Sequence, residues 1–212
     1  MTKVITSKEI AEWDKYYRIN LLNKLSGFKS ACLIGTCDKD GNTNLAVFNS
    51  VMHIGADPFY IGFILRPNTV ERHTYENIKA TNYYTINHIT TSIYQQSHQT
   101  SAKYERGVSE FEMCNLSEAY IDGFKAPFVE ESVVKLGLSF AEEQLIRSNQ
   151  TRLIIGKVEK IILPEDSIDQ NGDVRLDLLD SVVINGLNTY FKANYLEKLD
   201  FARPQPKIEE NS

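Results

Sequence analysis

The chain has 212 residues, of which 42% are hydrophobic and 24% are charged, and its net charge is −5 at pH 7. This length predicts one large domain, or a domain with an appendage, whose core needs no disulfide or metal to hold it. The acidic balance argues against broad binding to nucleic acid or to an anionic membrane. Three cysteines without a C-x-x-C pair, no signal-peptide core and no apolar run of membrane-spanning length predict a cytoplasmic protein with reduced thiols.

Residues 6–25 have the pattern of one N-terminal amphipathic helix. Thr6 and Glu9 have the spacing of a capping box, and apolar residues recur at helical intervals from Ile10 onward. Ser26-Gly27 is expected to end this helix.

Most of the remaining chain has the pattern of short strands separated by turns. The predicted strands cover residues 29–37, 42–55, 59–65, 82–89, 132–140, 151–163 and 180–193, and one helix covers residues 68–81. Residues 90–134 are polar and irregular, with short helical patches near 91–99 and 117–122, and we expect them to cover a site or a partner surface. Because hairpin turns dominate, the sequence predicts a mainly β fold, an antiparallel β-barrel with peripheral helices. We expect a single domain over residues 1–203 and a disordered tail over residues 204–212.

The motifs of several common enzyme classes are absent. The sequence has no G-x-G dinucleotide fingerprint, no phosphate-binding loop of the G-x-x-x-x-G-K type and no G-x-S-x-G nucleophile elbow. Its four histidines show no paired spacing, so no metal site is predicted, and no catalytic residue is singled out.

The segment RPNTVERHTYENI, residues 66–78, follows a predicted strand and begins the predicted helix. One interpretation is a plain helix cap, with Asn68 as the N-cap residue and Glu71 as the return acceptor. The other is an anion site, because the free N–H groups at a helix start attract negative charge. The residues that would serve an anion site are Arg66, Asn68, Thr69, Arg72, His73 and Thr74.

Two further segments carry polar residues that allow either a structural or a ligand-binding interpretation. In residues 44–55, Asn49 and Ser50 interrupt an apolar pattern, which indicates either a β-bulge or polar groups that face a ligand. Residues 97–111 hold a polar cluster, which is also common in ordinary surface loops. The members of this cluster are His98, Ser101, Lys103, Tyr104 and Arg106.

Taken together, these segments resemble the flavin reductase-like family with the FMN-binding split barrel. The resemblance rests on SGFKSACLIGTCDKDGNTNLAVFNSV, DPFYIGFILRP, RHTYENIKATNYYTINHI and HQTSAKYERGVSEFE in this order, with further likeness at APFVEESVVKLGL and GLNTYF. It covers roughly residues 21–204. The resemblance implies a six-stranded Greek-key antiparallel barrel that works as a homodimer, with noncovalent FMN near the dimer interface.

The resemblance also implies which residues hold FMN. Those that match the segment around the isoalloxazine ring are Phe48, Asn49 and Ser50. Those that match the grip on the ribityl phosphate are Arg66, Asn68, Thr69, His73 and Thr74. The segment from His98 to Tyr104, with His98 and Ser101 as its binding residues, matches the part that lies over or beside the flavin. His73 stands where many members carry lysine or aspartate, so Arg66 is expected to balance more of the phosphate charge.

The implied activity is that of an enzyme, an NAD(P)H-dependent flavin reductase that passes a hydride from nicotinamide to FMN. A bound flavin supplies the hydride chemistry itself, which agrees with a sequence that shows no acid–base pair. Two alternatives stay open: a flavoredoxin-like electron-transfer protein that a partner protein reduces, and a non-enzymatic binding module. The expected partners are a second copy of the chain and an electron acceptor such as a flavin-dependent oxygenase, but neither nucleic acid nor a membrane.

Overall fold

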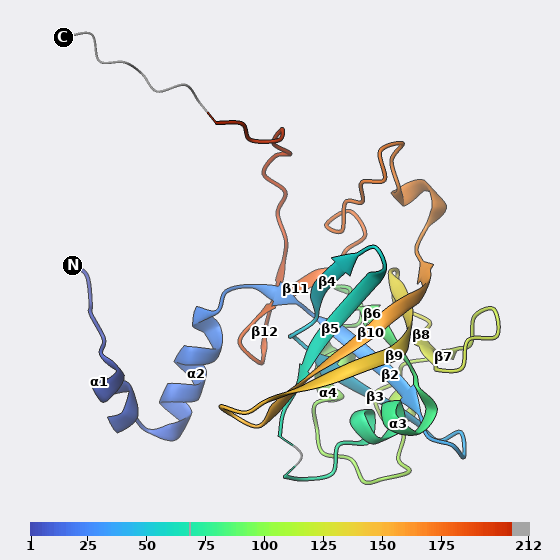
Figure 1. Ribbon diagram of the computed structural model, residues 1–212, viewed down its shortest axis with the longest axis horizontal. Helices are drawn as coiled ribbons and strands as arrows, with labels where there is room; N and C mark the ends of the chain where they lie inside the picture. The colour runs from blue at the N-terminus through green and yellow to red at the C-terminus, as the bar shows by residue number, and fades with distance from the viewer. Residues whose placement is uncertain (68, 205–212) are drawn as a thin grey trace.

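The computed structural model describes residues 1–67 and 69–204, which form mainly antiparallel strands with short helices around them (Figure 1). The main sheet has seven strands in the order β3-β2-β6-β9-β10-β5-β4. These strands are β2 (Cys32–Cys37), β3 (Thr43–Phe48), β4 (Met52–Ala56), β5 (Phe59–Leu65), β6 (Tyr83–His88), β9 (Lys135–Ile146) and β10 (Thr151–Ile162). The prediction of a mainly β, antiparallel fold is confirmed.

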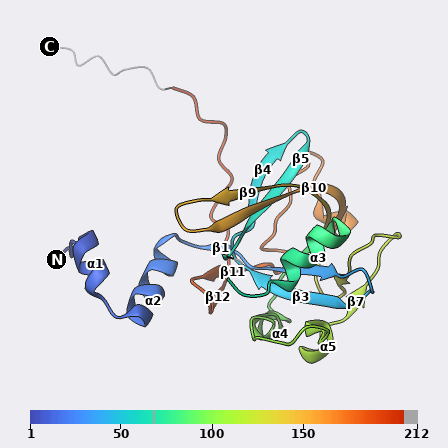
Figure 2. The ribbon, with the colours of Figure 1, turned by 60° about the horizontal axis from the view of Figure 1, so that its bottom comes forward.

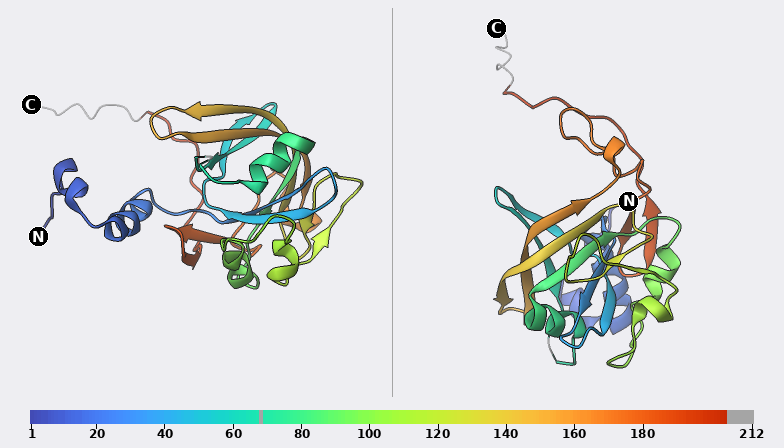
Figure 3. Two further views of the ribbon diagram at one scale, coloured as in Figure 1. Left: turned by 90° about the horizontal axis from the view of Figure 1, so that it is seen from below. Right: turned by 90° about the vertical axis from the view of Figure 1, so that its right-hand side faces the viewer.

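The two edge strands of this sheet, β3 and β4, follow one another in the chain and are joined by residues 49–51. The sheet therefore curls until its edges approach each other at this corner (Figure 3). The Ser50 hydroxyl accepts a hydrogen bond from Ile64 N at 3.0 Å and donates one to Ile64 O at 3.2 Å. The single strand predicted over residues 42–55 is thus wrong, because Ser50 bonds to β5 through its side chain and the strand breaks there.

Strand β2 is buried along its whole length because both of its faces are covered. On one face, Ile34 packs with Phe63 and Tyr84 inside the curled sheet. On the other face, Leu33 packs with Phe111 in a second core. Helix α5 (Glu110–Met113) supplies Phe111, and α4 (Tyr94–Gln99) lies near the same strands. The barrel interior and this outer core together hold β3 in place, and β3 forms one wall of the cleft described below.

The smaller strands lie outside the main sheet. They are β1 (Lys29–Ser30), β11 (Val182–Asn185) and β12 (Thr189–Lys192) in one three-stranded sheet, and β7 (Glu118–Ala119) paired with β8 (Phe128–Val129). A short 3-10 helix, η1 (Glu165–Ser167), precedes the Asn171-Gly172 turn.

Three sequence-based expectations for these outer segments need correction. The strand predicted over residues 180–193 is a hairpin that turns at Gly186, whose φ of 70° suits glycine. The strand predicted over residues 29–37 is interrupted at Ala31, and its first two residues pair with β11 rather than with the main sheet. The helical patch predicted near 117–122 is instead β7, because its backbone pairs with β8.

Helix α3 (His73–Thr81) begins five residues later than predicted. Arg72 is its N-cap residue, and Arg72 N donates to the Glu76 carboxylate at 3.2 Å. Glu76 rather than Glu71 therefore provides the carboxylate of the first turn. Asn68, predicted as the cap, lies outside the described residues. Helix α3 packs against β2 and β3.

The single helix predicted over residues 6–25 is two helices, α1 (Ser7–Glu12) and α2 (Lys15–Leu25). The Asp14 carboxylate accepts hydrogen bonds from Tyr16 N at 2.8 Å and Tyr17 N at 3.2 Å, which starts a new helix there. The predicted capping box of Thr6 and Glu9 is confirmed. We call residues 7–25 the N-terminal arm, because both helices project away from the barrel (Figure 2).

The chain after β12 runs outward along an extended path as far as Pro204. Of the tail predicted to be disordered, residues 205–212 lie outside the part that the structure describes. All three cysteines are buried and carry free thiols. Within residues 1–67 and 69–204, no helix combines the length and the apolar character needed to cross a bilayer.

Candidate functional site

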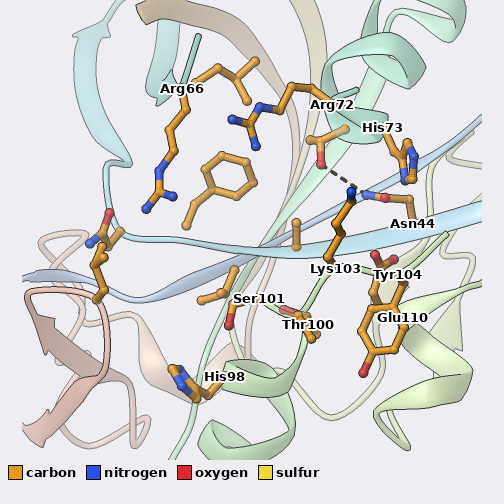
Figure 4. Close-up of a pocket in the computed structure, with 18 of the residues that line it drawn as sticks. Asn44, Arg66, Arg72, His73, His98, Thr100, Ser101, Lys103, Tyr104 and Glu110 are labelled. Carbon is orange, nitrogen blue, oxygen red and sulfur yellow. Dashed lines mark hydrogen bonds between the residues drawn. The ribbon is translucent and has the colours of Figure 1, made fainter. Parts of the chain in front are cut away.

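A cleft of about 1190 Å³ lies between the sheet corner, the start of α3 and the segment that follows α4. Figure 4 shows Arg66, Arg72 and His73 along one rim and Ser101 and His98 along the opposite rim. The sequence-predicted residues that line the cleft are Phe48, Asn49, Ser50, Arg66, His73, Thr74, His98 and Ser101. Thr69 is not among the lining residues, and Asn68 lies outside the described chain. The three polar segments of the sequence therefore meet in one place, although which of their residues bind a ligand stays a prediction.

The sheet corner is held rigidly by its own side chains. Asn49 Nδ2 donates to Gly186 O at 2.7 Å and ties the corner to the turn between β11 and β12. The Ser50 hydroxyl is fully engaged with the backbone of Ile64. Phe48 packs edge-on against Phe63 with ring centroids 5.0 Å apart. The corner therefore offers a ligand a fixed apolar and backbone surface, together with the second N–H of the Asn49 amide.

The start of α3 faces the cleft with unpaired donors. His73 and Thr74 occupy the first turn, where backbone N–H groups have no partner within the helix. The buried Thr74 hydroxyl accepts from Asn44 Nδ2 at 3.1 Å, and among the residues that the structure describes its own proton has no acceptor. Arg72 Nε is buried and has no hydrogen-bond partner within residues 1–67 and 69–204. These donors together favour an anionic group at this end of the cleft.

The charged side chains of the cleft wall are nearly balanced in an otherwise acidic chain. They are Arg66, Arg72, Lys103 and Arg106 against Glu71, Glu105 and Glu110, with His73 beside Glu71. Arg106 pairs with Glu76 on α3, which leaves Arg66, Arg72 and Lys103 to face a ligand. An anion beside the start of α3 would lie near Arg66 and Arg72 (Figure 4), despite the overall net charge of −5.

Glu110 is a buried carboxyl group that sequence reasoning missed. Its Oε2 accepts a hydrogen bond from Leu45 N at 2.9 Å, so α5 satisfies one backbone N–H of the edge strand β3. Burial raises the pKa of Glu110 above its ordinary value, while the hydrogen bond from Leu45 and the nearby His73 oppose the rise. The only sequence signal was the S-E-F motif, which does not reveal a partner 65 positions away.

His98 is positioned by a residue from the distant β12 strand. Its Nδ1 lies 3.3 Å from the Tyr190 hydroxyl, and the two rings meet edge to face with centroids 5.8 Å apart. Burial raises the pKa of Tyr190 to about 12, so Tyr190 stays a neutral hydrogen-bonding group. The β11–β12 hairpin thus fixes both His98 and the sheet corner.

Comparison with known proteins places this arrangement in a family. The sequence model of the flavin reductase like domain matches residues 25–180. A split-barrel protein from Shewanella frigidimarina NCIMB 400, assigned as a flavin reductase, is 41% identical; the alignment covers 95% of this chain and 100% of that chain, with a TM-score of 0.92. Nitrilotriacetate monooxygenase component B from Bacillus cereus is 18% identical, over 93% of this chain and 100% of its own, with a TM-score of 0.80. The flavoredoxin of Desulfovibrio vulgaris (Miyazaki F) is 18% identical, over 82% and 91% of the two chains, with a TM-score of 0.71.

The last two likenesses show the shared fold alone, whereas the first also reflects sequence. The alignment with the Shewanella protein leaves 5% of this chain uncovered. The two helices of the N-terminal arm, with 6 and 11 residues, are together longer than this uncovered part, so the alignment includes at least part of the arm. The predicted split barrel is confirmed, with seven strands in the main sheet where six were expected, because β3 and β4 are separate strands. The chain belongs to the flavin reductase like domain family.

Proposed function

We propose that this protein is an NAD(P)H-dependent flavin reductase that holds FMN in the cleft and transfers a hydride from the nicotinamide to it. The observation that carries the proposal is the meeting of donors at the start of α3 with the rigid sheet corner across one cleft. Membership of a flavin reductase family supports a flavin as the ligand. FMN fits better than a neutral flavin because one end of the cleft is built for an anion.

The phosphate of FMN fits the first turn of α3. The free N–H groups there and the positive end of the helix dipole favour a phosphate. Arg72 Nε would gain the acceptor that it lacks in the described residues, and Arg66 lies on the same rim. Hydrogen bonds to charged groups contribute about 1.5–3 kcal/mol each. Micromolar affinity needs about 8 kcal/mol in total, so a few such bonds together with burial of the ring suffice.

The ring system fits the opposite part of the cleft. Phe48 supplies an apolar surface, and the backbone of residues 49–50 is held by the bonds to Gly186 and Ile64. Cofactor and ligand sites usually have volumes of about 300–1,000 Å³. At about 1190 Å³ the cleft exceeds this range, which leaves room for a nicotinamide beside the flavin.

FMN, when bound, supplies the hydride-accepting centre of the reaction. The net exchange consumes NAD(P)H, FMN and one proton and yields NAD(P)⁺ and the two-electron-reduced flavin. In this proposal Arg66, Arg72 and Thr74 bind the phosphate, and the corner around Phe48 orients the ring. His98, held by Tyr190, lies on the opposite rim (Figure 4).

Titration of the flavin-free protein with FMN and with riboflavin tests the proposal, because riboflavin has the same ring without the phosphate. We expect FMN to bind at least tenfold more tightly, which corresponds to about 1.4 kcal/mol, or roughly one charge-assisted hydrogen bond. Equal affinities would contradict the assignment of the phosphate to α3. No binding of either flavin would contradict the proposal as a whole and favour a non-enzymatic binding module.

A flavoredoxin-like electron-transfer role is the second candidate, favoured by the fold shared with the Desulfovibrio flavoredoxin. It uses the same FMN site but takes its electrons from a protein rather than from a nicotinamide. It therefore predicts tight FMN binding with slow reduction by NADH and NADPH. In both cases the reduced flavin needs an electron acceptor, and a flavin-dependent oxygenase remains our prediction for it.

A further inference from the structure

Glu110 brings a buried carboxyl group to the wall of the cleft, and the proposed function gives it no role. It is the first residue of α5 and is only 6% exposed, whereas Glu71 and Glu105 on the same wall are exposed. Within residues 1–67 and 69–204, Glu110 forms no ion pair with a lysine or an arginine. Burial of a carboxylate without a paired cation costs free energy, so such a group tends to take up a proton instead.

This carboxyl group lies next to the turn to which the FMN phosphate is assigned. Its donor, Leu45 N, belongs to the residue that follows Asn44, and Asn44 Nδ2 donates to Thr74 Oγ1 at 3.1 Å. His73 is close enough to act on the charge of Glu110. Figure 4 shows Glu110 below Asn44 and His73 at the same end of the cleft. A phosphate at the start of α3 would therefore share this end of the cleft with Glu110.

The groups around Glu110 do not hold it in the ionised form. Strand β3 carries no titratable side chain, and Arg106 pairs with Glu76 rather than with Glu110. Burial raises the pKa of Glu110, while the hydrogen bond from Leu45 and the charge of His73 oppose the rise. The titratable residues on the elements packed around it are Glu71, His73 and Glu76 at α3, His98 on α4, Lys103, Tyr104, Glu105 and Arg106 in the segment after α4, and Glu112 and Cys114 at α5.

A bound phosphate would favour the neutral form of Glu110 further. A phosphate monoester carries about −1.5 to −2 charges at pH 7. Like charges that share a poorly solvated site disfavour each other's ionised form. Once protonated, a carboxyl group can donate as well as accept. Its O–H could then bond to a phosphate oxygen, while the other oxygen keeps the hydrogen bond from Leu45 N.

We propose that FMN binding is coupled to the uptake of one proton at Glu110, which then binds the phosphate as a neutral acid. The inference rests on the proposed function, because it takes FMN as the ligand. Solvent supplies the proton when FMN binds and receives it when FMN leaves. FMN therefore binds more tightly as the pH falls and leaves more readily as the pH rises through the window set by Glu110. Retention of the flavin thus becomes dependent on pH.

The test compares the FMN affinities of the wild type and of Glu110→Gln between about pH 5 and 8. Glutamine cannot ionise, and its amide oxygen still accepts from Leu45 N. Ionisation of the phosphate and of His73 affects both proteins alike, so the ratio of the two affinities reports on Glu110. This ratio should shift toward the variant by about tenfold per pH unit where the dependence is steepest. Glu112→Gln, at an exposed position on the same helix, should follow the wild type.

Riboflavin separates the effect of the phosphate from that of the ring. Because riboflavin lacks the phosphate, its affinity ratio between the wild type and Glu110→Gln should vary less with pH than that of FMN. An equal pH dependence of the ratio for both flavins, or an FMN affinity with the same pH profile in both proteins, would overturn this inference and leave the proposed function standing. Absence of FMN binding by the wild type would overturn both.

Infrared difference spectroscopy of the unmodified protein decides the question should Glu110→Gln fail to fold. Isotopically labelled glutamate identifies the carbonyl band of a protonated glutamic acid. This band should persist to a pH about one unit higher with FMN bound than with riboflavin or with no ligand, because only the phosphate adds negative charge beside Glu110. Loss of the band at the same pH in all three samples would overturn the proposal.

Discussion

Asn44 Nδ2 donates a 3.1 Å hydrogen bond to Thr74 Oγ1 and so joins strand β3 to the first turn of helix α3 inside the cleft (Figure 4). Both residues are buried. Asn77 Nδ2, one turn later on α3, bonds to Thr36 Oγ1 on β2 at 3.2 Å. These buried contacts fix the start of α3 relative to the sheet before any ligand arrives. A phosphate would therefore meet donors that need little rearrangement, which favours affinity.

Thr74→Val should weaken FMN binding about tenfold and destabilise the fold by about 1–3 kcal/mol, because Asn44 loses its nearer acceptor. Calorimetric titration with FMN and urea unfolding measure the two effects. Thr81→Val is the matched control on the same helix, where the hydroxyl donates to the backbone carbonyl groups of Asn77 and Tyr83. It should leave FMN affinity unchanged, and a similar loss of affinity in both variants would argue against a specific role of Thr74.

Arg72→Ala should weaken FMN binding more than Arg66→Ala does. Arg72 Nε is buried without a partner in the described residues, whereas Arg66 is exposed and its contribution is reduced by solvent. We expect losses of about a hundredfold and about tenfold, consistent with one or two charge-assisted bonds. Arg147→Ala, in the exposed turn between β9 and β10, is the charge-matched control. A larger loss of FMN affinity in Arg66→Ala than in Arg72→Ala would indicate that the phosphate lies closer to the outer rim of the cleft.

Glu110→Gln should flatten the dependence of stability on pH. Because burial raises the pKa of Glu110, the folded state binds more protons than the unfolded state at pH values from 4.5 up to the raised pKa. The wild type therefore loses unfolding free energy as the pH rises through this window, and the glutamine variant does not. The amide oxygen of glutamine still accepts from Leu45 N. Thermal unfolding measured across this pH window should show the stability of Glu110→Gln rising relative to that of the wild type as the pH increases. The control variant Glu112→Gln, at an exposed position, should have the same pH dependence of stability as the wild type.

Tyr84→Phe should leave stability unchanged or raise it. The Tyr84 ring is fully buried, and its hydroxyl has no hydrogen-bond partner in the described part of the chain. An unsatisfied buried hydroxyl costs about 1–3 kcal/mol, which phenylalanine would avoid. Gly156 lies directly against this hydroxyl, so Gly156→Ala should destabilise the wild type and do so less in the Tyr84→Phe background. Urea unfolding of the four proteins measures the coupling, and a destabilised Tyr84→Phe would point to a missed partner.

Local patterns predicted the turns at Asp40-Gly41 and Asp57-Pro58, because alternation and turn residues act over short stretches of chain, but they missed the β11–β12 hairpin. The N-terminal break was not predictable in this way, since Asp14 can continue one helix or cap a second, and the structure shows that it caps. The same ambiguity affects α3, where Glu71 and Glu76 compete to provide the carboxylate of the first turn.

In the candidate site, too, local sequence predicted some residues and missed others. The resemblance brought together the residues of the corner, of the α3 start and of the segment after α4, and they do line one cleft. The groups that hold those residues in place come from distant sequence. Glu110 bonds to Leu45, and Tyr190 positions His98 across 92 positions of the chain. Such partners depend on tertiary packing and leave no local signal.

The central claim is that this chain reduces FMN with a nicotinamide, and anaerobic rapid mixing tests it most directly. The FMN-loaded protein is mixed with NADH and, separately, with NADPH, and the visible absorption of the oxidised flavin is followed. The account predicts that at least one nicotinamide removes this absorption in a saturable, fast phase that free FMN does not show. Retention of the oxidised flavin spectrum with both nicotinamides, in protein that binds FMN tightly, would contradict it.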